Sequence, residues 1–208
     1  YRFYKLLEGG MDFKKIVQER RSIKYFDANH KMTKDEINEL FKMTVLSPTA
    51  FNIQHWRFDV IENKKLREEI KKISFNQSQV TDASLLVVIS GDLDAWKKNP
   101  RKYWKNADDN VQKMMESMIT NFYINKKEMQ RDEVMRSCSM AAMTMMLCAK
   151  NMGYDSCPMD GFDFPELSKL LQFPKNQIPV MFVAIGKKLQ DAWPRGGQLH
   201  LNQVVNYR

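Results

Sequence analysis

Apolar positions recur at helical spacing between Val134 and Met152. One face of this segment carries small and sulfur-containing side chains, at Cys138, Ala141, Ala142, Met145, Cys148 and Ala149. The opposite side is also apolar, at Met140, Met143, Met146 and Leu147. This i, i+3, i+4, i+7 repeat predicts a helix, and a helix that is apolar nearly all round is expected to pack against several neighbours. Gly153 predicts its end, because glycine adopts the left-handed conformation after a helix at little cost.

Shorter apolar runs predict strands, at residues 56–61, 85–90, 154–158 and 178–186. The continuous run LLVVIS at 85–90 is typical of a strand that is buried on both faces. Further helices are predicted at residues 12–20, 33–45, 63–73, 108–125 and 163–173. Thr33 and Glu36 have the spacing of a capping box. The mixture of helices and strands, without a regular βαβ alternation, predicts an α+β fold.

The segments between these elements are expected to be irregular. Polar loops are predicted at 50–55 and 75–80, a connecting region at 91–107, and a tight turn at 158–161. The polar tail from Lys187 has no helical period and is expected to lie against a second subunit. Residues 1–10 precede Met11 and are interpreted as an extension, with residues 11–208 forming a single domain.

Composition narrows the class of protein. No apolar run approaches the ~20 residues that a membrane-spanning helix needs, so no membrane association is expected. Three cysteines without C-x-x-C spacing indicate reduced thiols in a cytoplasmic protein. Three scattered histidines predict no metal site. A net charge of +8 permits an anionic partner, either a nucleic acid or a phosphorylated small molecule. The lysines are spread along the chain, which favours a solvated surface over a nucleic-acid site.

Four segments, in sequence order, resemble the motifs of the FMN-dependent nitroreductase family. They are RRSIKYF at 20–26, SPTAFNIQHW at 47–56, CPMDGFD at 157–163 and WPRGGQL at 193–199. The resemblance implies a three-layer sandwich around a mostly antiparallel central sheet. It also implies a homodimer whose C-terminal arms embrace the partner, with FMN bound at the subunit interface.

The basic residues of these motifs acquire expected roles from the resemblance. Arg20 and Arg195 match phosphate ligands, and bidentate guanidinium groups suit that chemistry. The second basic residue that the family has after Arg195 is Gly197 here, and Arg21 is expected to compensate. Ser22 is a further hydroxyl donor, or alternatively a turn residue. Lys24 matches the residue beside flavin N1 and O2, where a cation stabilises the reduced anion. A surface position is the alternative for each cation.

The remaining candidates match the loops around the flavin ring. Pro48, Thr49, Ala50 and Asn52 match the loop that reaches the flavin of the other subunit, whereas Asn76 and Gln79 match the pair on the pyrimidine edge. Residues Pro158, Met159, Asp160 and Gly161 match the loop that passes the ring. Lys24, Asp160 and Gly161 are the expected catalytic positions, with a backbone N–H directed at N5. Alternatively, Gly161 only makes a turn.

Three residues, one in the second motif and two on the helix predicted at 108–125, are left with open roles. His55 replaces the family's proline and is either a titratable group near the site or a surface histidine. Phe122 and Tyr123 either line the pocket or belong to the core.

The resemblance predicts an FMN-dependent oxidoreductase. Hydride from NAD(P)H would pass to flavin N5 and then to a nitroaromatic, quinone or similar small acceptor by a ping-pong mechanism. One alternative is a flavin-binding protein without turnover, and another is a specialised flavin, pteridine or enone reductase. A basic nucleic-acid-binding protein is the alternative from a different class.

Overall fold

A four-stranded antiparallel sheet forms the centre of the protein. The computed structural model describes residues 12–208, so the expectation about residues 1–10 lies outside the described residues. The strands are β1 (Trp56–Val60), β2 (Leu85–Asp92), β3 (Asp155–Met159) and β4 (Gln177–Gly186). Their order is β1-β2-β4-β3, and every neighbouring pair is antiparallel. The predicted α+β fold with an antiparallel central sheet is confirmed.

Strand β2 is buried along its whole length because both faces of the sheet are covered. Leu85, Val87 and Ile89 join the hydrophobic cluster on one face. Leu86 and Val88 alternate with them and join the cluster on the other face. Alternate side chains of a strand point to opposite faces, so the continuous apolar run at 85–90 reflects two cores and not one.

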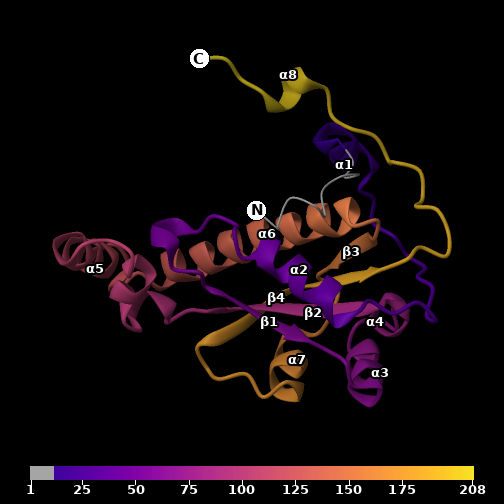
Figure 1. Cartoon of the computed structure of the whole chain (residues 1–208), viewed down its shortest axis with the longest axis horizontal. Coiled ribbons are helices and arrows are strands. Elements are labelled where there is room, and N and C mark those ends of the chain that lie inside the picture. The colour runs from indigo at the N-terminus through magenta and orange to yellow at the C-terminus, as the bar shows by residue number, and fades with distance from the viewer. Residues whose placement is uncertain (1–11) are drawn as a thin grey trace.

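Helices on both faces complete three layers (Figure 1). On one face lie α2 (Lys34–Thr44) and α6 (Lys127–Asn151), and α1 (Phe13–Glu19) packs beside α6. On the other face lie α3 (Lys64–Lys72), α4 (Gln79–Asp82) and α7 (Phe164–Leu170). No helix among residues 12–208 is both long and apolar enough to cross a bilayer.

The segments expected to be irregular contain short helices. The 50–55 loop holds η2 (Ala50–Asn52), and the 91–107 region holds η3 (Ala95–Lys97) and η4 (Pro100–Trp104). Helix α4 begins inside the expected 75–80 loop. These segments lack an apolar period, so their turns depend on tertiary contacts such as the hydrogen bond from Trp104 Nε1 to the Phe51 carbonyl oxygen. Helix α5 (Asp109–Tyr123) projects from the body beyond them (Figure 1).

Helix starts follow the local sequence. Thr33 Oγ1 accepts from the Glu36 backbone N–H, and a Glu36 side-chain oxygen accepts from the Thr33 N–H at 2.8 Å, which confirms the capping box. Asn63 and Asp108 cap α3 and α5 in the same way with their side-chain oxygens. Such caps satisfy backbone donors that the helix itself leaves unpaired.

Helix α6 differs from its prediction in two respects. It begins at Lys127, seven residues before the predicted start, because the polar segment there lacks an apolar period but contains good helix formers. Its end is confirmed, since Gly153 has a φ of +77°. The helix is not buried all round, because Met140 and Met143 are 38% and 40% exposed. Nothing in the described chain packs on that face closely enough to cover it.

The segment after β4 leaves the body and runs past α1 (Figure 1). Its only regular element among the described residues is the four-residue α8 (Leu201–Val204). Trp193 and Leu199 are 65% and 68% exposed. The tail therefore presents large apolar side chains to solvent in the single chain.

Candidate functional site

Three guanidinium groups meet at the end of α1. Arg20 and Arg21 follow that helix directly, and Arg195 comes from the tail. Arg21 donates to the Trp193 carbonyl oxygen, and Arg195 Nη2 donates to the Gln18 carbonyl oxygen at 2.9 Å. These bonds fasten the tail to α1. Burial lowers the pKa of Arg20 below its usual value, and repulsion from Arg195 and Arg21 adds to the effect.

The three arginines have no carboxylate partner in the described part of the chain. Among residues 12–208, no ion pair links Arg20, Arg21 or Arg195 to an acidic group. Glu19 is next to them in sequence, but it pairs with Lys15 and Lys150. Three like charges held together without a counter-charge provide a site for an anion, and guanidinium groups suit the geometry of phosphate.

The segment from Ser22 to Lys24 runs along the edge strand β3. Ser22 and Ser156 form a parallel bridge, and the Ile23 N–H donates to the Ser156 carbonyl oxygen at 3.0 Å. Ile23 is 2% exposed, so the alternation of an extended chain directs Ser22 and Lys24 away from the core. Edge strands have unpaired backbone groups, which explains why this segment can attach here.

The Cys157 thiol on β3 has Lys24, Gln79 and Arg20 in its surroundings. Burial raises the pKa of this thiol, whereas Lys24, Gln79 and Arg20 act to lower it. Gln79 is 4% exposed and begins α4. The structure therefore places this predicted pyrimidine-edge residue and the predicted lysine in the surroundings of the same thiol.

Gly161 lies against the loop that precedes α4. Gln77 Nε2 donates to the Gly161 carbonyl oxygen and to the Ser74 carbonyl oxygen, both at 3.2 Å. A Cβ on Gly161 would lie 3.3 Å from Gln77 Nε2 and 3.5 Å from the Phe75 ring. A Cβ at this position would therefore require only a small displacement of the Gln77 amide, so packing within the chain does not by itself demand glycine here.

The predicted turn at 158–161 starts later than expected. Pro158 and Met159 belong to β3, and Met159 is buried at 4% exposure. Proline is tolerated there because β3 is an edge strand. The turn is limited to the exposed Asp160 and to Gly161, with the Phe162 N–H bonded to the Asp160 carbonyl oxygen at 3.1 Å.

The loop beside Gly161 has unusual backbone geometry. Phe75 and Asn76 have φ values of +52° and +54°, and Phe75 is 79% exposed. Left-handed backbone at a residue as bulky as phenylalanine is strained, and such strain concentrates at functional sites. Phe75 and Gln77 were not among the residues predicted from the sequence. Of the three neighbours, only Asn76 is of a residue type that commonly adopts a positive φ.

The second group of predicted residues forms a loop around η2. Thr49 Oγ1 accepts from the Gln54 N–H at 3.0 Å, and Asn52 Nδ2 donates to the Tyr103 carbonyl oxygen at 2.9 Å. Asn52 and Gln54 have φ values of +57° and +53°. Pro48 is exposed at the start of this loop, and Ala50 begins η2.

The chain does not bring its two groups of predicted residues together. The Phe51 ring packs against Phe122 at 5.3 Å between centroids, near the start of α6, whereas Glu19 approaches Lys150 at the other end of that helix. A 25-residue helix at ~1.5 Å per residue is roughly 37 Å long. The loop at 48–52 therefore lies far from the arginines, as Figure 1 shows.

Comparison with known proteins identifies the family. Residues 17–187 match the Nitroreductase family. The chain belongs to the nitroreductase family. It is 44% identical over 182 residues to protein DrgA of Synechocystis, covering 88% of this chain and 87% of DrgA. It is 32% identical to MhqN of Bacillus subtilis, provisionally named an NAD(P)H nitroreductase, covering 94% of this chain and 98% of MhqN.

Solved structures of the nitroreductase fold support the same conclusion. A protein of Exiguobacterium sibiricum, provisionally described as a nitroreductase and crystallised in complex with FMN, superposes with a TM-score of 0.88. The two sequences are 27% identical, and the match covers 95% of this chain and 98% of the other. The expected three-layer arrangement with a mostly antiparallel sheet is thus shown by both the fold and its relatives.

His55, which replaces the family's proline, is not at the surface, so the expectation of a surface histidine is wrong. It is 1% exposed, and burial lowers the pKa of its imidazole. Neither ring nitrogen has a hydrogen-bond partner among the described residues. Tyr123 is also fully buried and belongs to the core, with its ring 6.3 Å from that of His55. Phe122 is 40% exposed and remains available on the outer side of α5.

No cluster of three or more His, Cys, Asp or Glu side chains capable of holding a metal occurs among residues 12–208. The three cysteines are free thiols, and Cys138 and Cys157 are buried.

Proposed function

We propose that this nitroreductase-family protein is an FMN-dependent NAD(P)H oxidoreductase that reduces nitroaromatics, quinones or similar small acceptors. The observation that carries the proposal is the group of three guanidinium groups at Arg20, Arg21 and Arg195. They have no acidic partner among the described residues, and Arg20 and Lys24 both lie in the surroundings of Cys157 on β3. The three arginines would bind the phosphate of an organic phosphate, and Lys24 would lie beside its ring.

The residues present match the parts of FMN. The arginines suit its phosphate dianion, and Ser22 offers a hydroxyl next to them. The side-chain amides of Asn76 and Gln79 each provide a donor and an acceptor for the pyrimidine edge. FMN, when bound, supplies the redox chemistry, because it takes two electrons from NAD(P)H and passes them to the acceptor.

The protein's part is to bind, orient and tune. The Lys24 ammonium would stabilise the negative charge that the flavin gains on reduction, a role that needs no proton transfer by the protein. Residues Pro158, Met159, Asp160 and Gly161 would supply the backbone beside the ring. Donor and acceptor would use the same exposed face in turn, which gives ping-pong kinetics.

A homodimer completes the proposed site. Residues 48–52 lie far from the arginines of their own chain, so the loop of a second copy would supply them. Large apolar side chains are exposed on α6, α5 and the tail, including Met140, Met143, Met118, Trp193 and Leu199. Exposed apolar patches of this kind mark association surfaces, and the tail is suited to embrace the partner.

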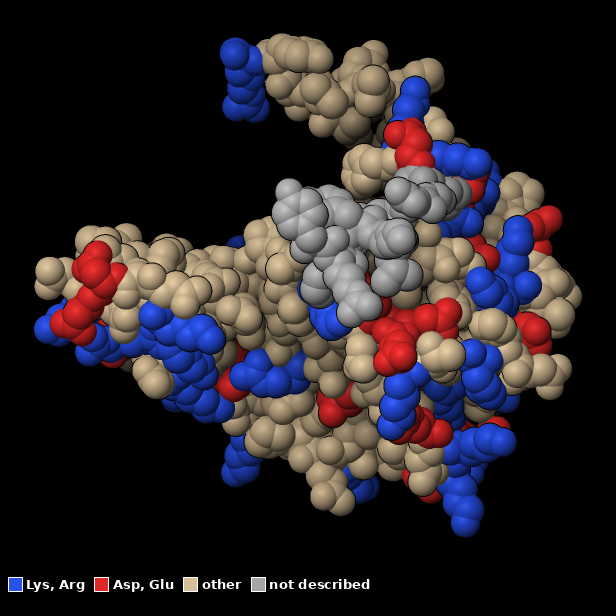
Figure 2. Space-filling model, in the orientation of Figure 1, with Lys and Arg blue, Asp and Glu red and all other residues tan. Residues whose placement is uncertain are grey.

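A nucleic-acid-binding function is less consistent with the surface. In Figure 2, basic and acidic side chains intermingle over the visible face and form no continuous basic strip. A flavin-binding protein without turnover would use the same residues. The visible spectrum of the purified protein, followed by anaerobic addition of NADH or NADPH, separates these possibilities.

We expect a yellow protein that either nucleotide bleaches and that an acceptor reoxidises. A yellow protein that neither nucleotide reduces would show binding without turnover. A protein that stays colourless after incubation with excess FMN would contradict the proposal.

A further inference from the structure

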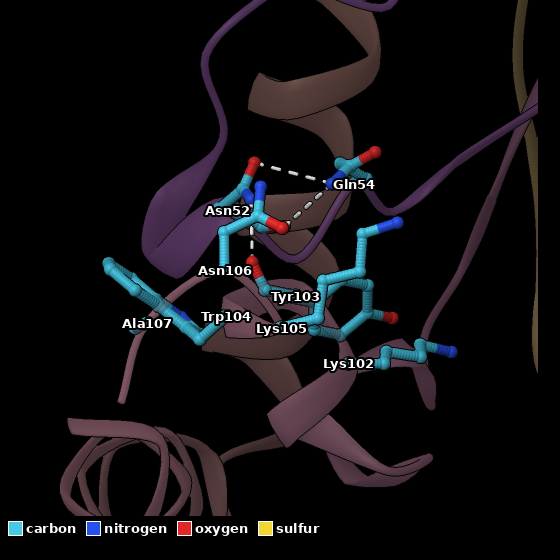
Figure 3. A pocket seen from close by; sticks show the side chains of 8 residues that line it. All are labelled: Asn52, Gln54, Lys102, Tyr103, Trp104, Lys105, Asn106 and Ala107. Carbon is cyan, nitrogen blue, oxygen red and sulfur yellow. Dashed lines mark hydrogen bonds between the residues drawn. The ribbon is translucent and has the colours of Figure 1, made fainter. Parts of the chain in front are cut away.

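A cavity of about 390 Å³ lies between the η2 loop and the segment that leads into α5. Its lining is shown in Figure 3 and consists of Asn52, Gln54, Lys102, Tyr103, Trp104, Lys105, Asn106 and Ala107. Its volume is within the range of small-molecule sites. The lining combines amides, aromatic rings and two cations, so it suits a polar organic molecule better than an apolar one.

The cavity carries net positive charge. Lys102 and Lys105 are both exposed, and no acidic side chain lines the cavity. The acids that follow in sequence have other partners. Asp108 caps α5 through bonds to the Asn110 and Val111 N–H groups, and Asp109 pairs with Arg101 and Lys113. The two lysines are therefore available to an anionic ligand.

One wall of the cavity has a constrained backbone. Asn52 and Gln54 both have positive φ values, the Gln54 amide donates to Asn52 Oδ1, and the Asn52 amide donates to the Tyr103 carbonyl oxygen. The Gln54 amide nitrogen is engaged by Asn52, and in Figure 3 the amide oxygen of Gln54 points away from these bonds. Strain held in place by hydrogen bonds is typical of binding sites.

We propose that this cavity binds an anionic group, phosphate or carboxylate, on the electron donor or acceptor, with Lys102 and Lys105 as its ligands. The inference rests on the proposed function, because Asn52 belongs to the loop that would face the FMN of the partner subunit. The cavity then adjoins that ring. The anion has two sources: the 2′-phosphate of NADPH, or a carboxylate on an aromatic acceptor.

The test uses FMN-loaded, full-length protein and ligands that do not react. Binding of 2′,5′-ADP is compared with that of 5′-AMP, and binding of benzoate with that of benzamide, by calorimetry and by the flavin absorbance change. The Lys102→Gln/Lys105→Gln double variant removes both cations. Lys64→Gln/Lys65→Gln on α3 is the matched control, because it removes the same charge from exposed positions at the opposite side of the molecule (Figure 1).

We expect the cavity variant to weaken binding of one anionic ligand by roughly fivefold to tenfold, as expected for the loss of two partly solvated ion pairs. The cavity variant should bind the uncharged ligand of that pair with nearly the wild-type affinity. The control variant should bind both ligands like the wild type. Added salt should weaken binding of the anionic ligand to the wild type. A selective effect on 2′,5′-ADP assigns the site to the donor, and one on benzoate assigns it to the acceptor.

Equal losses in both double variants, or no loss for either anion, would overturn the inference. If the wild type is yellow and bleached by NAD(P)H in that case, only this inference fails. If the wild type does not bind FMN, the proposed function fails as well.

Discussion

Gln77 holds the Gly161 peptide by a hydrogen bond from its side-chain amide to the Gly161 carbonyl oxygen at 3.2 Å. The same amide bonds to Ser74, and the Asp163 N–H bonds to the Ile73 carbonyl oxygen at 2.9 Å. These bonds join two loops that are more than eighty residues apart in sequence. The orientation of the peptide that would pass the flavin ring therefore depends on a side chain outside the family motifs recognised in the sequence.

Replacing Gln77 by methionine keeps the length of the side chain but removes the donor. We expect the free energy of unfolding to fall by about 1 kcal/mol, because the partly buried Gly161 carbonyl loses its hydrogen-bond donor. We also expect flavin reduction by NAD(P)H to slow, since the Gly161 peptide is no longer fixed. Thermal unfolding of the FMN-free protein and stopped-flow reduction of the holoprotein measure the two effects. An unchanged reduction rate would limit Gln77 to a structural role.

Arg20→Ala should affect the FMN-free and FMN-bound proteins in opposite ways. Without FMN, the unfolding temperature should stay the same or rise, because burial and repulsion from Arg21 and Arg195 oppose the Arg20 charge. FMN affinity should fall by roughly tenfold to a hundredfold, as for the loss of charge-assisted hydrogen bonds. Fluorescence titration measures the FMN affinity, and thermal unfolding of the FMN-free protein measures the unfolding temperature. Arg131→Ala, on the exposed side of α6, is the control. Normal FMN affinity in the Arg20 variant would argue against the phosphate site.

Lys24→Met should make the reduction potential of bound FMN more negative. A cation beside N1 and O2 stabilises the negative charge that the ring gains, so its loss disfavours the reduced form. FMN affinity should change less than the potential. Spectroelectrochemical titration measures the potential, with Lys31→Met, at an exposed position, as the control. A potential equal to that of the wild type would place the Lys24 charge away from the ring.

His55 should make the protein sensitive to acid. Burial lowers the pKa of His55 in the folded state below the ordinary value of 6.5, and the nearby charges are those of Glu133, Asp92 and Arg57. The unfolded state therefore binds more protons just below pH 6.5, so stability falls as the pH drops through that value towards the folded pKa. The slope from one such group is at most about 1.4 kcal/mol per pH unit.

Unfolding by urea between pH 5 and 7 measures this dependence. His55→Phe should flatten the slope, whereas His200→Ala, in the exposed tail, should leave it unchanged. An identical slope in wild type and His55→Phe would show that other groups cause the acid sensitivity.

Met143→Glu should dissociate the proposed homodimer. Met143 is 40% exposed in the single chain, so a glutamate there is compatible with the folded protomer but would place a charge in an apolar interface. We expect a protomer mass by light scattering and a parallel loss of FMN, because the 48–52 loop of a second copy would complete the site. Lys169→Glu on the exposed side of α7 is the control. A variant that remains dimeric and yellow would exclude α6 from the interface.

Local features of this protein were readable from its sequence. The capping box at Thr33 and Glu36, the glycine end of α6 and the buried strand at 85–90 all appeared where they were predicted. These features depend on neighbours within a few residues, and the order of the motifs was enough to indicate the family.

Contacts between distant segments were decided only by the tertiary structure. Packing brings Arg195 to Gln18, Gln77 to Gly161 and His55 into the core, and it separates the 48–52 loop from the arginines. Each depends on how helices pack on two faces of one sheet. A sequence pattern records which side of an element is apolar, but it does not record which other element that side will meet.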